Sequence, residues 1–330
     1  MYTAPATSVI DQFRDADDFL SNYSGYPVEY RGRRFETAAH AFAAAQSDAP
    51  GWASVVQSAR TGRDAENLAR QGRMRDDWAS VRDTAMAEVL LSKFTFNPEL
   101  GEQLRATGDA LLIDTNDDGE QYWGRCLHTD LHVPAGMNML GRTLMGLRRE
   151  LRGDPSDRWP RVALTGHREH LIRPGSRDWV RAELDRIAVK LRDEHDTEIA
   201  SSGLATGSDT WWAESALAAG LTLWGYQPFP EQPARWSAEQ QAVHAWLCES
   251  AQRLVLVGPY PDVGFFDTRN QLLLTDADAI VAVHDPRITR GGTVSALGRH
   301  CTGIPLITVN LEQHTTTINF LPPAADPHRL

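Results

Sequence analysis

The chain has 330 residues and a net charge of −11, and 42% of its residues are hydrophobic. This length predicts two domains of about 150 residues, and the composition is that of a globular protein. An acidic chain lacks the positive surface that sustained binding to duplex DNA requires. From the sequence we expect neither a membrane-spanning stretch nor a signal peptide.

The N-terminal half, residues 1–151, is typical of a mainly α-helical domain. Its predicted elements are helices at 37–47, from Asp76 onward, at 97–108 and at 138–151, and a short strand at 110–114. Thr37 is expected to cap the first helix, and Asn97 the third, with Pro98 at its first helical position. An apolar face on the second helix, continued by Lys93, consists of Trp78, Val81, Ala85 and Val89.

A change of pattern follows residues 152–160, RGDPSDRWP, which are typical of a linker. From 161 to 309, helical segments alternate with short apolar runs: RVALT, TEIASS, LTLWGY, RLVLV, AIVAV and PLITV. Such alternation is typical of an α/β doubly wound, Rossmann-like parallel sheet that is covered by helices on both faces. The polar and proline-rich residues 310–330 are expected to form a flexible tail.

Three glycine-bearing segments of this second half each begin where a predicted strand ends: TGHR at 165–168, SGLATGSD at 202–209 and RGGT at 290–293. In a doubly wound sheet these positions meet at the carboxyl edge, where ligands bind. Glycine lets the backbone approach a phosphate, and the next helix offers unpaired N–H groups. Arg168 and Arg269 could add bidentate contacts. Each loop alone could be only a turn, but three loops on one edge favour phosphate binding.

The order of these motifs over 161–309 resembles the SLOG superfamily. That group includes DNA-processing protein A, cytokinin-releasing phosphoribohydrolases and nucleotide-sensing domains of defence systems. The segments that carry the resemblance are TGHR, SGLATGSDTWWAE, PFPEQPARW, TRNQLLLTDADAIVAV and RGGT. The resemblance implies a nucleotide site that consists of Gly166, His167, Arg168, Gly203, Gly207, Asp209, Glu214, Arg269, Asn270, Gly291, Gly292 and Thr293.

One position departs from this resemblance. The phosphoribohydrolases have a catalytic glutamate three residues after the glycine-threonine motif, and Ala296 stands there in this chain. The resemblance therefore implies that this domain binds a nucleotide rather than hydrolysing one. The resemblance also makes a homo-oligomer formed through the SLOG-like domain possible.

The N-terminal half alone gives few chemical signals. His40 on the alanine-rich helix is typical of a half-buried structural histidine. Cys126, His128 and His132 match no common zinc spacing, so no metal site is expected. The three cysteines of the chain, of which Cys126 is the first, are scattered, and we expect reduced thiols in a cytoplasmic protein.

Several segments over residues 13–151 resemble the NADAR family, which is named for its association with NAD and ADP-ribose metabolism. They are FLSN at 19–22, TAAHAFAAAQ, DDWASVRDTAMAEVLLSKF, NPELGEQLRATGD, EQYWG and NMLGRTLMGLRREL. The family is similar to N-glycosidases that act on riboflavin-pathway intermediates, and some members remove ADP-ribose from guanine. The resemblance implies the catalytic residues Glu120, His40, Glu36 and Lys93, and the ligand-binding residues Asn22, Trp123, Gly124, Asn138 and Gly141.

Cleavage of an N-glycosidic bond passes through a cationic, oxocarbenium-like sugar, which a nearby carboxylate can stabilise. The family's helix usually begins Thr-Val-Glu-His and ends in lysine. Here Ala39 replaces the glutamate and Gln46 the lysine. Glu120, three residues before Trp123, is the better surviving carboxylate, and Glu36 precedes the helix.

Two functions stay open. The first is an ADP-ribose-type N-glycosidase coupled to a nucleotide-sensing domain. The second is an inactive protein that senses or sequesters an NAD-derived nucleotide such as ADP-ribose or cyclic ADP-ribose; Ala39 and Ala296 favour it. In both cases no cofactor is required, and the partner is an ADP-ribose or NAD-related small molecule rather than a membrane. Nucleic acid is expected only as an ADP-ribosylated base substrate.

Overall fold

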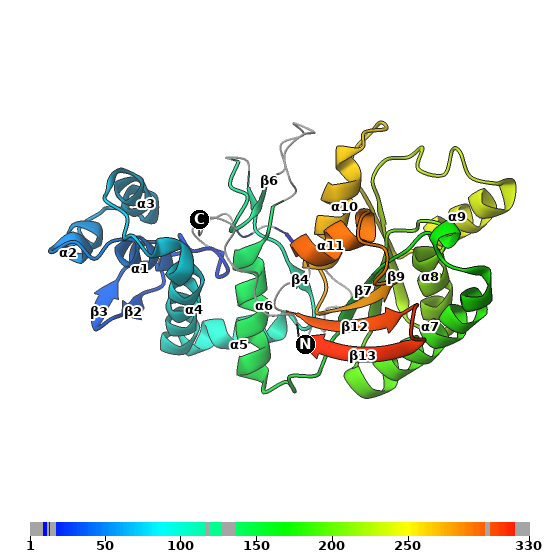
Figure 1. The fold of residues 1–330 in the computed structure, drawn as a ribbon. Helices are drawn as coiled ribbons and strands as arrows, with labels where there is room; N and C mark the ends of the chain where they lie inside the picture. The colour runs from blue at the N-terminus through cyan, green and yellow to red at the C-terminus, as the bar shows by residue number, and fades with distance from the viewer. Residues whose placement is uncertain are drawn as a thin grey trace. The chain divides into compact units, whose positions relative to one another are not determined.

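The structure is a computed structural model, and it describes residues 9–11, 13, 18–116, 119–126, 136–300 and 304–320. The chain divides into two compact units, and the boundary between Pro155 and Ser156 lies inside the predicted linker. In Figure 1 the first unit runs from blue to green and the second from green to red. Within the described ranges, no helix combines the length and the apolar character that crossing a membrane requires.

The first unit is mainly helical. Its helices are α1 (Ala38–Ala45), α2 (Trp52–Gln57), α3 (Gly62–Gln71), α4 (Trp78–Phe96), α5 (Pro98–Ala106) and α6 (Met139–Arg152). Short strands pair as β1 (Val9–Ile10) with β4 (Leu111–Leu112), β2 (Val28–Tyr30) with β3 (Arg33–Phe35), and β5 (Thr115–Asn116) with β6 (Arg125–Cys126).

Helix α1 lies at the centre of this unit. Thr37 caps it as expected, since its side chain accepts a hydrogen bond from the His40 amide. The alanines of α1 are almost all buried, and their small side chains let α2, α3 and α4 pack closely around the helix. Gly62 is part of this close packing, because a Cβ atom there would lie 3.0 Å from the Cβ of Ala39.

The end of α4 corrects one prediction. Asn97 precedes α5, but its side chain makes no capping bond to that helix. Its Nδ2 atom instead donates to the carbonyl oxygens of Lys93 at 2.8 Å and Pro27 at 3.0 Å. The predicted cap is therefore wrong, and Asn97 ties the end of α4 to the segment before β2.

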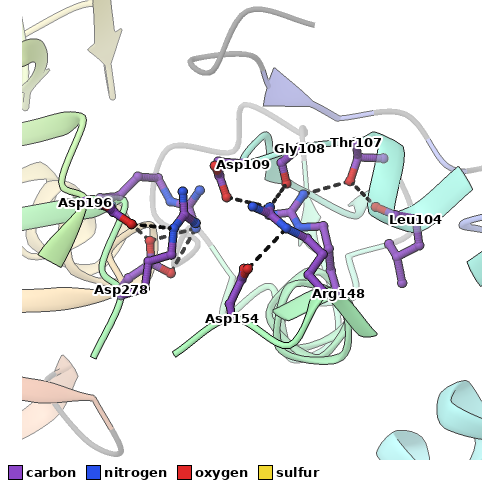
Figure 2. Close-up of polar contacts among 11 residues, drawn as sticks. Leu104, Thr107, Gly108, Asp109, Arg148, Asp154, Asp196 and Asp278 are labelled. Carbon is purple, nitrogen blue, oxygen red and sulfur yellow. Dashed lines mark hydrogen bonds and ion pairs between the residues drawn. The ribbon is translucent and has the colours of Figure 1, made fainter. Parts of the chain in front are cut away.

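Two arginines of α6 attach that helix to the end of α5 (Figure 2). Arg148 donates to the Thr107 hydroxyl at 2.8 Å, and Thr107 donates to the carbonyl of Leu104 at 2.7 Å. Arg152 donates to Gly108 O at 3.0 Å and to Asp109 Oδ1 at 2.9 Å. These bonds satisfy carbonyl groups that the end of a helix leaves unpaired.

The second unit contains a seven-stranded mixed sheet. Its strands are β7 (Arg161–Gly166), β8 (Ile199–Ser202), β9 (Thr222–Gln227), β10 (Arg253–Leu256), β11 (Ala279–His284), β12 (Pro305–Asn310) and β13 (Thr315–Phe320). Its helices are η1 (Glu169–Leu171), α7 (Pro174–His195), α8 (Ser208–Ala218), α9 (Ala238–Ser250), α10 (Gly264–Thr275) and α11 (Gly292–His300).

The strand order is β10-β9-β8-β7-β11-β12-β13, and all neighbours are parallel except β12 and β13. From β7 the chain continues to one side of the sheet, and from β11 to the other. Val162, Leu164, Val281 and Val283 join α7 and α8 in one core, while the alternate residues of β7 and β11 are also buried. Both faces of the central strands are therefore covered, as a nearly continuous apolar run predicts.

The start of β7 is fixed by a buried ion pair (Figure 2). Asp278 accepts hydrogen bonds from the backbone amide of Arg161 and from its guanidinium, both at 3.0 Å. The pair joins the loop before β11 to the first residue of β7, so the two central strands are held in register.

The tail prediction is wrong for residues 315–320. These residues form β13, which pairs antiparallel with β12. Pro305 lies opposite Phe320 at one end of the pairing, and Asn310 lies opposite Thr315 at the other. The threonine-rich sequence TTTINF favours an extended strand. This strand also makes the sheet mixed rather than wholly parallel. Residues 321–330 lie outside the described residues.

Candidate functional site

A pocket of about 380 Å³ lies in the first unit. Residues from several distant segments form its walls: Phe13, Ser21, Asn22, Tyr23, Ala39, Phe42, Ala43, Gln46, Arg63, Glu66, Arg70, Met86, Asp114, Thr115, Asn116, Glu120, Trp123 and Leu140. Three of the residues expected from the sequence are therefore brought together here, namely Asn22, Glu120 and Trp123. Ala39 and Gln46, the two replaced positions, also line this pocket.

Aromatic rings form part of the wall. Phe42 packs edge-on against Trp123 with ring centroids 5.2 Å apart, and Tyr23 lies on the pocket wall as well. Phe42 is in turn 5.2 Å from Trp78 of α4, which holds it in place. Half-buried aromatic rings offer flat apolar surfaces on which a heterocyclic base can stack.

The Glu120 carboxylate is held by its own loop. Its Oε1 atom accepts from the amide of Tyr122 at 2.9 Å, and its Oε2 atom accepts from the amide of Gly124 at 2.8 Å. Both oxygens therefore stabilise the turn that presents Trp123. This residue is a pocket carboxylate and also a structural part of the pocket wall.

Helix α3 places three charged side chains on the pocket, and the sequence analysis missed them. Tyr23 donates to Glu66 Oε2 at 2.6 Å, and Arg70 donates to Glu66 Oε1 at 2.8 Å. The Arg63 guanidinium lies 5.1 Å from the Tyr23 ring. The spacing of residues 63, 66 and 70 puts their side chains on one helical face. This spacing of charged residues is the sequence signal from which they could have been predicted as pocket residues.

Asn22 carries an unsatisfied polar atom. Its backbone carbonyl accepts from the amide of Ala39 at 2.8 Å, which fixes the residue against α1. Its side-chain Oδ1 atom is buried and has no hydrogen-bond partner in the described structure. A buried acceptor of this kind favours a ligand that brings a donor.

Lys93 lies behind the pocket rather than on its wall. It is fully buried, and its Nζ atom donates to the carbonyl of Ser21 at 2.7 Å and to the hydroxyl of Ser24 at 3.0 Å. Burial lowers the pKa of Lys93 from its ordinary value to about 7, against the opposing charge of Asp18. Its visible role is to fix the turn that carries Asn22.

His40 and Glu36 are not brought to the pocket wall. His40 is buried, with its Nε2 atom 3.3 Å from the carbonyl of Ala59 and its Nδ1 atom 2.8 Å from the hydroxyl of Thr37. Because a carbonyl can only accept, Nε2 donates and Nδ1 accepts. Glu36 is exposed just before α1. The geometry gives His40 a structural role.

The remaining predicted residues of this unit support the loop that carries Asp114. Asn138 accepts from the Asp114 amide at 2.9 Å and donates to the carbonyl of Leu112 at 2.8 Å. A Cβ atom at Gly141 would lie 2.2 Å from that same carbonyl oxygen, and one at Gly124 would lie 2.6 Å from the carbonyl of Asp114. Close backbone approach explains both glycines.

In the second unit, the predicted residues Asp209 and Arg269 form a buried ion pair of 3.3 Å. A Cβ atom at Gly203 would lie 1.1 Å from Arg269 Nη1, so glycine is required there. Burial raises the pKa of Asp209, and the charges of Arg269 and Arg168 oppose that effect. The positive charges of two arginines thus face the single carboxylate of Asp209. The Nε atom of Arg269 has no hydrogen-bond partner in the described structure.

Gly166 and Gly207 bring the end of β7 against the start of α8. A Cβ atom at Gly166 would lie 2.5 Å from the Cβ of Ser208, and Gly207 has a φ of 94° that favours glycine. His167 is buried with an unpartnered Nε2 atom, and its ring lies 5.3 Å from that of His284. Burial and the neighbouring His284 lower the pKa of His167.

The other predicted residues of this unit differ in their surroundings. Glu214 pairs with Arg181 of α7 at 3.1 Å, and Asn270 is half-buried on α10. Gly291 and Gly292 are exposed, and a Cβ atom at either would meet open space. Thr293 is buried one residue later, in the first turn of α11.

Within the described ranges, no group of three or more His, Cys, Asp or Glu side chains could hold a metal ion. Cys126 and Cys248 are half-buried, and burial raises the pKa of the Cys248 thiol to about 11. His128, His132 and Cys301 lie outside the described residues.

A family model and several known proteins are similar to part of this chain. The family model described as the NADAR domain matches residues 3–152. N-glycosidase YbiA of Escherichia coli (strain K12) is 30% identical over 153 residues, which cover 44% of this chain and 89% of that protein. N-glycosidase Npun_R5314 of Nostoc punctiforme (strain ATCC 29133 / PCC 73102) is 30% identical over 138 residues, which cover 40% of this chain and 85% of that protein. The NMR structure of Escherichia coli YbiA covers 44% of this chain and 86% of that one, at 27% identity and a TM-score of 0.40.

Proposed function

The chain belongs to the NADAR domain family through residues 3–152, and from this premise we propose that its first unit is an N-glycosidase. The substrate would be a ribosyl–base compound of the ADP-ribose type, such as an ADP-ribosylated guanine or an NAD-derived nucleotide. The reaction would replace the N-glycosidic bond with a bond to water.

The observation that carries this proposal is the composition of the pocket. Its volume of about 380 Å³ is within the range of small-molecule sites. Tyr23, Phe42 and Trp123 offer ring surfaces for a base, and the unsatisfied Asn22 Oδ1 offers an acceptor. Carboxylates on the same wall can stabilise the cationic sugar that forms when the bond breaks.

A second function is favoured by two positions on the pocket wall. Ala39 and Gln46 stand where the resemblance implies a glutamate and a lysine, and both line the pocket. A protein that binds an NAD-derived nucleotide without cutting it would need neither group. The alternative is therefore a sensor or a sequestering protein.

For the second unit we propose a Rossmann-like, SLOG-type nucleotide site that regulates the first unit. The strand order supports it, because the chain reverses direction across the sheet between β7 and β11, and ligands of open α/β sheets bind at such a point. Gly291 and Gly292 also support it, because a Cβ atom at either would meet open space. A further support is the positive charge of Arg168 and Arg269, which exceeds the single negative charge of Asp209.

Incubation of the full chain with candidate compounds tests the proposed activity. These are ADP-ribosylated guanine nucleotide, NAD, cyclic ADP-ribose and riboflavin-pathway intermediates, with products and retained ligand identified by mass spectrometry. Release of free base from one of them supports the N-glycosidase. Recovery of a bound compound intact, with no base released from any of them, supports the sensor instead.

A further inference from the structure

We propose that Glu66 of α3 is the reacting carboxylate of the pocket, a role that the sequence assigned to Glu120. This inference rests on the proposed N-glycosidase function. It concerns which of the described pocket carboxylates, Glu66, Asp114 and Glu120, faces the bond that breaks.

The first argument is the position of Glu66 relative to Ala39. Gly62 lies one helical turn before Glu66 on the same face of α3. A Cβ atom at Gly62 would lie 3.0 Å from Ala39 Cβ and 3.1 Å from Tyr23 Cδ1. This face of α3 therefore packs against α1 at Ala39. Two small residues, Ala39 and Gly62, let the two helices approach closely there, and Glu66 is the next charged group along that face.

The second argument is how the carboxylates are held. The Glu66 oxygens accept from the phenol of Tyr23 at 2.6 Å and from the guanidinium of Arg70 at 2.8 Å, and both donors lie on the pocket wall. Its side chain keeps 35% of its surface exposed. An ionised carboxylate has about four acceptor positions, so Glu66 retains capacity for a water molecule. The Glu120 oxygens accept from backbone amides of their own loop and so stabilise the turn at 120–124, whereas both donors to Glu66 are side chains.

The chemistry then follows with atoms and charge in balance. The bond between C1 of the ribose and the base nitrogen breaks, and its electron pair leaves with the base, which gains a proton from solvent. The Glu66 carboxylate faces the cationic sugar and takes a proton from the attacking water. The water oxygen bonds to C1, and Glu66 then returns its proton to solvent.

The matched pair Glu66→Gln and Glu99→Gln tests this assignment in the full chain. Glu99 is an exposed carboxylate in the first turn of α5, away from the pocket wall. Since proton transfer by a positioned side chain contributes about 10²–10⁴-fold, we expect Glu66→Gln to lower kcat at least 100-fold with KM nearly unchanged. Glu99→Gln should behave as the wild type.

The outcomes separate this inference from the proposed function. If the wild type releases base and Glu66→Gln keeps a kcat within threefold of it, Glu66 is not the reacting carboxylate although the N-glycosidase stands. If Glu120→Gln lowers kcat at least 100-fold while Glu66→Gln does not, the role belongs to Glu120. If the wild type releases no base, the proposed function itself fails. Unchanged circular dichroism spectra of the glutamine variants confirm that each folds.

Discussion

The Nζ atom of Lys93 and the carbonyl oxygen of Ser21 are joined by a hydrogen bond of 2.7 Å across 72 residues of sequence. The bond links α4 to the turn that carries Asn22 onto the pocket wall, and the Ser24 hydroxyl accepts a second bond from the same lysine. A buried amine thus holds a wall of the pocket from behind.

Lys93 gives the first unit a pH-dependent stability. Burial lowers its pKa from 10.5 to about 7, so above pH 7 the unfolded chain binds one more proton than the folded chain. The contribution of Lys93 to the free energy of unfolding therefore increases with pH between 7 and 10 and is constant below that window. Relative to Lys93→Met, we expect the wild type to gain on the order of 2 kcal/mol between pH 7 and pH 9.

Urea unfolding at several pH values, followed through hydrogen exchange of α4 peptides, measures that difference. Lys190→Met is the control, because Lys190 is an exposed lysine that pairs with Glu194 on α7. A difference between wild type and Lys93→Met that stays constant from pH 7 to pH 9 would show that the lysine is not deprotonated in the folded state.

Gly203→Ala is expected to destabilise the second unit by about 3 kcal/mol. The new methyl group would occupy the place of Arg269 Nη1 and force the buried pair with Asp209 apart, and both overpacking and a broken buried pair are costly. Gly298→Ala is the control, because its Cβ atom would meet open space inside α11 and should stabilise that helix slightly. Calorimetric unfolding compares the two variants; equal transition temperatures would contradict the prediction.

Gly292→Asp is expected to remove nucleotide binding from the second unit without harming its fold. The side chain would project into open space at the start of α11, where its negative charge would repel a phosphate. Calorimetric titration of the full chain with ADP-ribose should show two sites in the wild type and one in the variant. Gly298→Asp on the same helix should retain both sites. If the Gly292→Asp variant still binds ADP-ribose at two sites, the nucleotide of the second unit does not bind at the start of α11.

Local signals explain what the sequence predicts of the fold. The cap of Thr37 on α1 is confirmed. The predicted apolar face of α4 is confirmed at Ala85 and Val89, which are buried, while Trp78 and Val81 are half-buried. The short apolar runs of the second half correspond to β7–β12. The cap at Asn97 fails because the side-chain amide of Asn97 is held by the backbone carbonyls of Pro27 and Lys93, both outside α5.

Helix α3 shows why the candidate site is harder to predict. Its sequence, GRDAENLARQ, is mostly polar, and Gly62, Ala65 and Ala69 are its buried residues. Its buried stripe consists of small residues that give only a weak signal in the sequence, and its place beside α1 depends on the contact of Gly62 with Ala39. Asn22, Glu120 and Trp123 do line the pocket, yet their catalytic or ligand-binding roles stay predictions.

In the proposed function, the pocket of the first unit cuts its ligand rather than storing it. The most direct test is the ratio of free base released to protein present, measured under excess ADP-ribosylated guanine nucleotide with the full chain. The account predicts a ratio that rises steadily past one and keeps rising until the substrate is consumed. A ratio that stays near zero while one intact ligand is retained per pocket would contradict it.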